Sequence, residues 1–124
     1  MTFNAPPMTG TVKPPYTGKR VYLAGPMSGY VDYNFPAFNT AANKLRADGH
    51  YVFSPAENDY LLYGNDFLDH PETASYRKCL EDDLRWICRY AEVIALLPGW
   101  EKSAGVKAEK ALADCLKLEV IVLD

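Results

Sequence analysis

The sequence predicts an α/β protein with a parallel sheet of about four strands and helices on both faces of that sheet. Two observations predict this class. Short apolar runs rich in β-branched residues alternate along the chain with longer segments of helical character, which is the order of elements in parallel sheets. The chain also has 124 residues, 48% of them hydrophobic, which suits one domain with a core of ordinary size.

The first part of the chain predicts a tail, a strand and a helix. Residues 1–18 hold four of the nine prolines and show no periodicity, so we expect a flexible N-terminal tail and a single domain over residues 19–124. Residues 21–25 (VYLAG) predict a buried strand. Residues 34–49 predict a helix with Asn34 as its N-cap, and Gly49 ends it. Its apolar stripe consists of Phe38, Ala41, Ala42 and Leu45.

The second part predicts three more strands separated by helices. Strands are expected over residues 51–55, 93–98 and 119–123, and helices over residues 71–91 and 106–116. Residues 56–70 are predicted as a polar and aromatic loop, too long for a bare connector and therefore a functional candidate. We expect a flavodoxin-like, Rossmann-like strand order of 2-1-3-4. In such a sheet, the loops 25–33, 55–69 and 99–105 meet at the carboxyl edge, where ligands bind.

Composition excludes several classes of function. The formal charge of −3, without a basic patch, argues against a nucleic-acid polymer as partner. Three cysteines without a CxxC pattern predict neither a disulfide framework nor a zinc site, and they indicate reduced thiols in a cytoplasmic protein. The N-terminus does not resemble a secretory signal, and no apolar stretch is long enough to span a membrane.

Two carboxylates stand out because helical spacing places them near inward faces. Asp83 lies on the stripe of the helix 71–91 that runs through Tyr76, Leu80, Leu84, Ile87 and Ala91, whereas Glu81 and Asp82 lie off the stripe and are expected to be solvated. Glu109 lies at the edge of the stripe of Gly105, Ala108, Leu112 and Cys115 or Leu116. Each acid has a plain structural reading, as a boundary residue or as dipole compensation. Two acids converging on one site would instead suit glycosyl transfer.

Two loops suit a nucleotide ligand. In AGPMSG (24–29), Gly25, Met27, Ser28 and Gly29 follow the first strand and allow close backbone approach to a sugar or phosphate. In SAG (103–105), Ser103 and Gly105 precede a helix and suit a phosphate, although Ser103 capping the helix is an equally good reading. Tyr22 on the first strand either reaches the site or packs in the core. Tyr30 and Trp100 either stack on a base or, as loop aromatics often do, cover the core.

These motifs in this order resemble the nucleoside 2-deoxyribosyltransferase-like superfamily. The resemblance rests on VYLAGPMSG (21–29), Asp83-Leu84, VIALLPGW (93–100) and SAGVKAEKALA (103–113), and it covers residues 20–124. Its closest form is that of short bacterial and phage members of unknown function. The resemblance implies a flavodoxin-like fold and cleavage of an N-glycosidic bond with retention.

The resemblance also implies roles for single residues. Glu109 matches the family's nucleophile, Asp83 matches the Asp that serves the departing base, and Tyr22 matches the Tyr that orients the nucleophile. Ser103 matches the phosphate-binding Ser of the branch that hydrolyses 2′-deoxynucleoside 5′-monophosphates. The chain departs from that branch at Ser28, where the branch has an Arg, and the residues after the nucleophile are Lys110-Ala111 instead of the family's x-Gly.

The resulting expectation is an N-hydrolase or deoxyribosyltransferase acting on a (deoxy)nucleoside 5′-monophosphate. Its partner is the small-molecule nucleotide or nucleoside, no cofactor or metal is needed, and the family implies a homo-oligomer, at least a dimer. The main alternative is a nucleotide-binding or sensing module without turnover, because a fold does not fix a function. A third alternative is a small interaction protein in which both acids are boundary residues.

Overall fold

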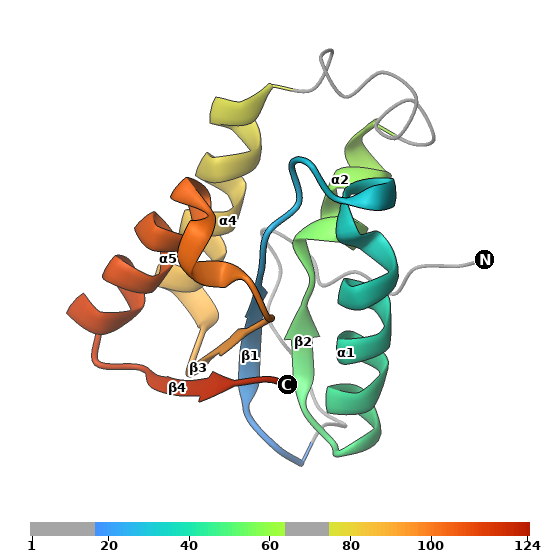
Figure 1. Ribbon diagram of the computed structural model, residues 1–124. Coiled ribbons are helices and arrows are strands. Elements are labelled where there is room, and N and C mark those ends of the chain that lie inside the picture. Colours follow the sequence, from blue (N-terminus) through green and yellow to red (C-terminus); the bar gives the residue numbers. More distant parts are fainter. Residues whose placement is uncertain (1–16, 64–74) are drawn as a thin grey trace.

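The computed structural model describes residues 17–63 and 75–124, and these form a flavodoxin-like α/β fold around a four-stranded parallel sheet (Figure 1). The strand order is β2-β1-β3-β4, as the sequence predicts. The strands are β1 (Arg20–Ala24), β2 (Tyr51–Phe53), β3 (Val93–Leu96) and β4 (Glu119–Val122). The helices are α1 (Phe35–Ala47), α2 (Pro55–Tyr63), α4 (Tyr76–Tyr90) and α5 (Ala104–Cys115), with short 3-10 turns η1 (Val31–Asn34) and η3 (Trp100–Lys102).

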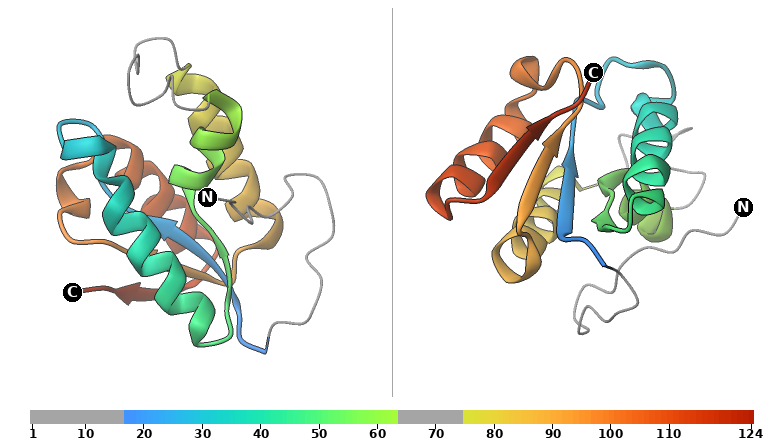
Figure 2. Two further views of the ribbon diagram at one scale, coloured as in Figure 1. Left: turned by 90° about the vertical axis from the view of Figure 1, so that its right-hand side faces the viewer. Right: turned by 90° about the horizontal axis from the view of Figure 1, so that it is seen from below.

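Helices cover both faces of the sheet (Figure 2). Each face has its own hydrophobic core. Because side chains alternate along a strand, β1 sends Val21 and Leu23 to the α1 face and Tyr22 and Ala24 to the face covered by α4 and α5. The four residues of β3 are all buried. The two central strands are therefore apolar on both sides, which is why they read as continuous apolar runs.

The segment after β2 corrects one prediction. The helix α2 is formed by residues 56–63, expected to belong to a loop, together with Pro55, expected to end the strand. The rest of the predicted loop, residues 64–70, lies outside the described residues. The helix shows no apolar stripe because it turns polar side chains inward: Glu57, Asn58 and Asp59 are all buried. Glu57 accepts two hydrogen bonds from the Arg46 guanidinium of α1, at 2.7 and 2.6 Å. This bidentate ion pair holds α2 against α1.

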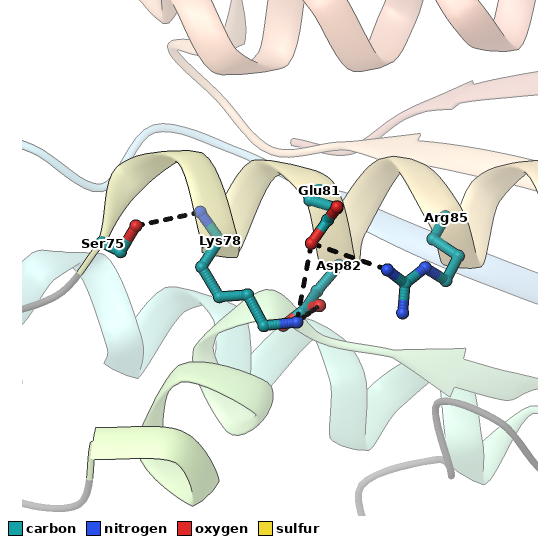
Figure 3. Close-up of polar contacts among 5 residues, drawn as sticks. All are labelled: Ser75, Lys78, Glu81, Asp82 and Arg85. Carbon is teal, nitrogen blue, oxygen red and sulfur yellow. Dashed lines mark hydrogen bonds and ion pairs between the residues drawn. The ribbon is translucent and has the colours of Figure 1, made fainter.

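The helix α4 corrects two further expectations. Within the described residues it begins at Tyr76, because the Ser75 hydroxyl accepts a hydrogen bond from the backbone N–H of Lys78 (3.2 Å); the expected start at residue 71 lies outside the described residues. Asp82, expected to be solvated, is buried and bonded to the Lys78 ammonium (Figure 3). Glu81 is exposed, as expected. The apolar stripe predicted for this helix also left out Trp86, which is fully buried.

The helix α5 faces the sheet one residue away from the predicted face. Its buried residues are Val106, Glu109 and Ala113, not the expected stripe, in which Ala108 is exposed. Glu109 therefore lies in the centre of the inward face, and helical spacing identified the residue but not its depth.

The entry to α1 also differs from the prediction. Asn34 is the N-cap residue in the left-handed region, but its side chain makes no cap bond. Its amide Nδ2 donates instead to the Pro26 carbonyl (2.9 Å), so it ties the ends of the first loop together.

Candidate functional site

A pocket of about 820 Å³ opens at the carboxyl edge of the sheet. β1 and β3 pair up to Ala24 and Leu96, and beyond these residues the chain leaves toward opposite faces of the sheet, which is the switch point where such folds bind ligands. The pocket lining includes residues from the loop after β1, from α2, from α4 and from the start of α5. Described parts of all three loops expected at this edge therefore meet here.

Most of the predicted site residues line this pocket. Glu109 and Asp83 do so, and so do the following residues of the two loops: Gly25, Met27, Ser28, Ser103 and Gly105. Gly29 does not line it; this residue has a φ of +84° in the exposed turn of the first loop. Tyr22 does not line it either.

Tyr22 reaches the site through Glu109. The phenol is fully buried in the face covered by α4 and α5, where it stacks on Phe53 with ring centroids 5.6 Å apart. Its hydroxyl donates a hydrogen bond to Glu109 Oε2 at 2.8 Å. Both readings of Tyr22 hold together: the ring packs in the core, and the hydroxyl fixes one oxygen of the carboxylate. The ring packing restricts the hydroxyl to this direction.

The two acids of the pocket have different proton affinities. Burial, opposed by hydrogen bonds from Tyr22 and Asp83, raises the pKa of Glu109 to about 7. Burial and the negative charge of Glu109 raise the pKa of Asp83 well above its ordinary value. The hydrogen bond from Asp83 favours the ionised form of Glu109, whose charge in turn keeps the proton on Asp83. When the pair carries a single proton, this proton therefore resides preferentially on Asp83 and the negative charge on Glu109.

Asp59 is a third acid of the pocket, and the sequence analysis missed it. It lies on α2, lines the pocket and is only 3% exposed. Burial raises its pKa to about 7, a hydrogen bond from the Cys79 thiol opposes that effect, and the charge of Asp82 adds to it. The only signal in the sequence was the length of the polar stretch 56–70, which marked the segment but no residue within it.

Two basic residues of α4 close to Asp83, Lys78 and Arg85, already pair with other acids. Lys78 bonds to Asp82 at 2.5 Å and lies 3.7 Å from Glu81, which also approaches Arg85 (Figure 3). Among the described residues, no ion pair joins a cation to Asp59, Asp83 or Glu109. The acidic end of the pocket is therefore negative when its carboxyl groups ionise.

The start of α5, called here the anion end of the pocket, brings groups to the pocket that are able to bind an anion. Ser103 caps α5 by accepting a hydrogen bond from the N–H of Val106 (3.3 Å), which confirms the capping reading and leaves its own hydroxyl proton to donate. Lys102 lines the pocket beside it. A Cβ at Gly105 would lie 3.3 Å from the Tyr76 hydroxyl, so this exposed tyrosine of α4, predicted as part of an apolar stripe, reaches the start of α5.

Two features of the first loop shape the pocket entrance. A Cβ at Gly25 would lie 2.7 Å from that of Leu97, so only glycine permits this close approach of the loops after β1 and β3. Asp32, Tyr33 and Asn34 all have positive φ between 50° and 63°, a left-handed turn that costs free energy for residues with a Cβ. Tyr33 lines the pocket, as does Tyr30. Of the two readings of Trp100, the structure shows the second, because this side chain packs against the core.

Two further properties concern metals and membranes. Within residues 17–63 and 75–124, no group of three or more His, Cys, Asp or Glu side chains is arranged to hold a metal ion. In the same ranges, no helix combines the length and the apolar character that crossing a membrane requires.

Comparison with known proteins gives one assignment. No curated protein matches the sequence. A family model described as "Domain of unknown function (DUF4406)" matches residues 19–122, which include every element of the sheet and the whole described pocket, and the chain therefore belongs to this family.

Proposed function

We propose that this protein cleaves the N-glycosidic bond of a (deoxy)nucleoside 5′-monophosphate with retention of configuration. One observation carries the proposal: a buried tyrosine hydroxyl holds Glu109 at 2.8 Å in a pocket that also contains Asp83, a second carboxyl group with a different proton affinity. Retaining glycosidic cleavage requires such a pair, one group as nucleophile and the other as acid. The resemblance of the sequence motifs to the nucleoside 2-deoxyribosyltransferase-like superfamily supports the same chemistry.

In the first step, the Glu109 carboxylate attacks C1′ of the sugar. The bond from C1′ to the base nitrogen breaks, its electron pair leaves with the base, and the Asp83 carboxyl gives that base a proton. The hydrogen bond from Tyr22 holds the attacking carboxylate in place. The product of this step is a sugar phosphate joined to Glu109 as an ester.

In the second step, a water molecule or an acceptor base attacks C1′ of this ester. Asp83, now a carboxylate, removes the proton of the nucleophile, and the ester oxygen returns to Glu109 as a carboxylate. Attack by water makes the protein a hydrolase, and attack by a second base makes it a transferase.

The anion end of the pocket favours a nucleotide over a free nucleoside. Lys102, the Ser103 hydroxyl and the backbone N–H groups at the start of α5 suit a phosphate. Glu109 follows Ser103 by six residues, which corresponds to about 9 Å along the helix axis at 1.5 Å per residue. Its side chain leans back toward the helix start, which brings the carboxylate within the span of one nucleotide. Lys102 also supplies the positive charge that the first loop, with Ser28, does not provide.

The test is base release, followed by chromatography, from a panel of ribo- and deoxyribonucleoside 5′-monophosphates, with and without an acceptor base. We expect the wild type to release a base and Glu109→Ala to release none while still binding the nucleotide. Asp114→Ala is the matched control, because Asp114 is an exposed acid of the same helix, paired with Lys110. Release that depends on the acceptor would identify a transferase.

Binding without release by the wild type would contradict the proposal. That result would favour a nucleotide-sensing module, the alternative that shares this pocket. Failure of every nucleotide both to react and to raise the melting temperature would favour an interaction protein.

A further inference from the structure

Asp59 is a pocket residue that the proposed chemistry does not use. It lines the same pocket as Asp83 and Glu109 and is 3% exposed. The Cys79 thiol hydrogen-bonds to its carboxylate, but Asp59 Oδ1 is buried without a hydrogen-bond partner among the described residues. Buried acceptors are nearly always bonded in native proteins, so an unbonded one at a pocket wall needs an explanation.

A purely structural role does not explain this acid. Glu57, two residues earlier on α2, shows what a structural acid looks like, because it is bonded at both oxygens to Arg46. Within residues 17–63 and 75–124, Asp59 has no cationic partner of this kind, and its negative charge disfavours ionisation of Asp83 and of Glu109. The buried Asp59 carboxylate therefore lowers the stability of the folded state, and it also opposes the ionisation of Glu109, which the proposed reaction needs. A ligand that donates a hydrogen bond to Asp59 would offset that cost.

The arrangement of the pocket indicates which part of a nucleotide meets Asp59. With the phosphate at Lys102 and Ser103 and the sugar carbon at Glu109, the base extends toward Asp83, which supplies its proton. Asp59 lies on α2 in the wall of the same pocket, and it is close enough to Asp83 and to Glu109 for its charge to act on both. The base is thus the part of the ligand that faces this carboxylate.

We propose that Asp59 reads the leaving base by accepting a hydrogen bond from its exocyclic amino group, so that the pocket prefers cytosine-type or adenine-type nucleotides to their keto counterparts. Carboxylates accept hydrogen bonds from amino groups of bases in this manner elsewhere. At a pH above its pKa of about 7, Asp59 is ionised. A keto oxygen at the same place would then face a carboxylate that has no proton to donate, leaving two buried acceptors unbonded. This inference rests on the proposed function and adds the class of base to it.

The test compares substrates that differ only in this group. At about pH 8, where Asp59 is ionised, we would measure kcat/KM for base release from cytosine and uracil deoxynucleoside 5′-monophosphates, and from the adenine and hypoxanthine pair. For the wild type we expect a preference of about tenfold or more for an amino base. Asp59→Asn offers an amide N–H to a keto oxygen. We therefore expect the ratio of kcat/KM for the amino base to kcat/KM for the keto base to be about tenfold lower in this variant than in the wild type.

The control separates base reading from a general disturbance of α2. Glu57 lies on the same helix as Asp59 but does not line the pocket. Glu57→Gln weakens the bond to Arg46 of α1 and leaves the pocket wall unchanged, so it should lower kcat/KM equally for both members of each pair. An Asp59→Asn variant that also loses activity equally on both members would overturn the inference. So would a wild type without preference for amino bases.

The proposed function can fail independently. If no nucleotide releases its base, calorimetric binding of the same pairs to wild type and Asp59→Asn replaces the rate measurement. A Kd ratio in favour of the amino base that Asp59→Asn abolishes would support base reading without catalysis. Equal Kd values, or no binding of either nucleotide, would overturn it.

Discussion

Replacing Asp59 by asparagine should stabilise the protein at alkaline pH and leave its stability unchanged in acid. Burial raises the pKa of this carboxyl from 3.8 to about 7. Between these two values the folded state keeps a proton that the unfolded chain has lost, so the free energy of unfolding falls as the pH rises through this window. Below the lower value both states are protonated, and the buried charge costs nothing.

The size of the effect follows from the two pKa values. They differ by roughly three pH units, and one unit corresponds to about 1.36 kcal/mol, so ionised Asp59 costs the folded state roughly 4 kcal/mol above neutral pH. An asparagine carries no charge, but its amide also needs partners in a buried position. We therefore expect Asp59→Asn to raise the free energy of unfolding by about 2 to 4 kcal/mol at about pH 8.

Urea unfolding followed by tryptophan fluorescence measures this effect, because Trp86 is fully buried. Wild type and Asp59→Asn should be compared at intervals from about pH 4 to about pH 8, and their difference should grow as the pH rises. Asp114→Asn is the control: it removes an exposed charge and should change stability by less than about 1 kcal/mol. Equal stability of wild type and Asp59→Asn at about pH 8 would contradict this prediction, because it would mean that the Asp59 carboxylate is compensated in the folded state.

Three further predictions address the anchor of α2, the nucleophile and the anion end. Arg46→Ala leaves Glu57 buried without its cation and should lower the free energy of unfolding by about 3 to 5 kcal/mol, and Glu57→Gln in that background should recover part of the loss in the same urea titration. Tyr22→Phe removes a bond that favours ionised Glu109, so the acidic limb of the kcat/KM profile should move to higher pH, and an unmoved limb would contradict the assigned role. Lys102→Ala should raise KM for the 5′-monophosphate by about fivefold or more and leave that for the free nucleoside unchanged; equal changes for both would place the phosphate elsewhere.

Local pattern in the sequence was sufficient to predict the architecture. The runs over residues 21–25 and 93–98 are apolar throughout because both faces of the central strands are buried. Alternation of strands and helices then requires parallel strands, and the confirmed order β2-β1-β3-β4 places the first and third loops at one switch point. Gly25 and Ser103 mark these loops because close approach and helix capping each favour one residue type.

Only the tertiary structure shows which polar residues face inward and which groups they contact. Hydrophobic periodicity identifies an inner face only where that face is apolar, so α2, which buries Glu57 and Asp59, read as a loop. Asp82 and Asp83 are both buried, yet one is paired with Lys78 and the other faces the pocket. Spacing along a helix indicates the face on which a side chain lies. It does not indicate which residues that side chain contacts, because these come from segments far apart in the chain. The acidic end of the pocket, with carboxyl groups from α2, α4 and α5, therefore became visible only when the three helices were placed together around one sheet.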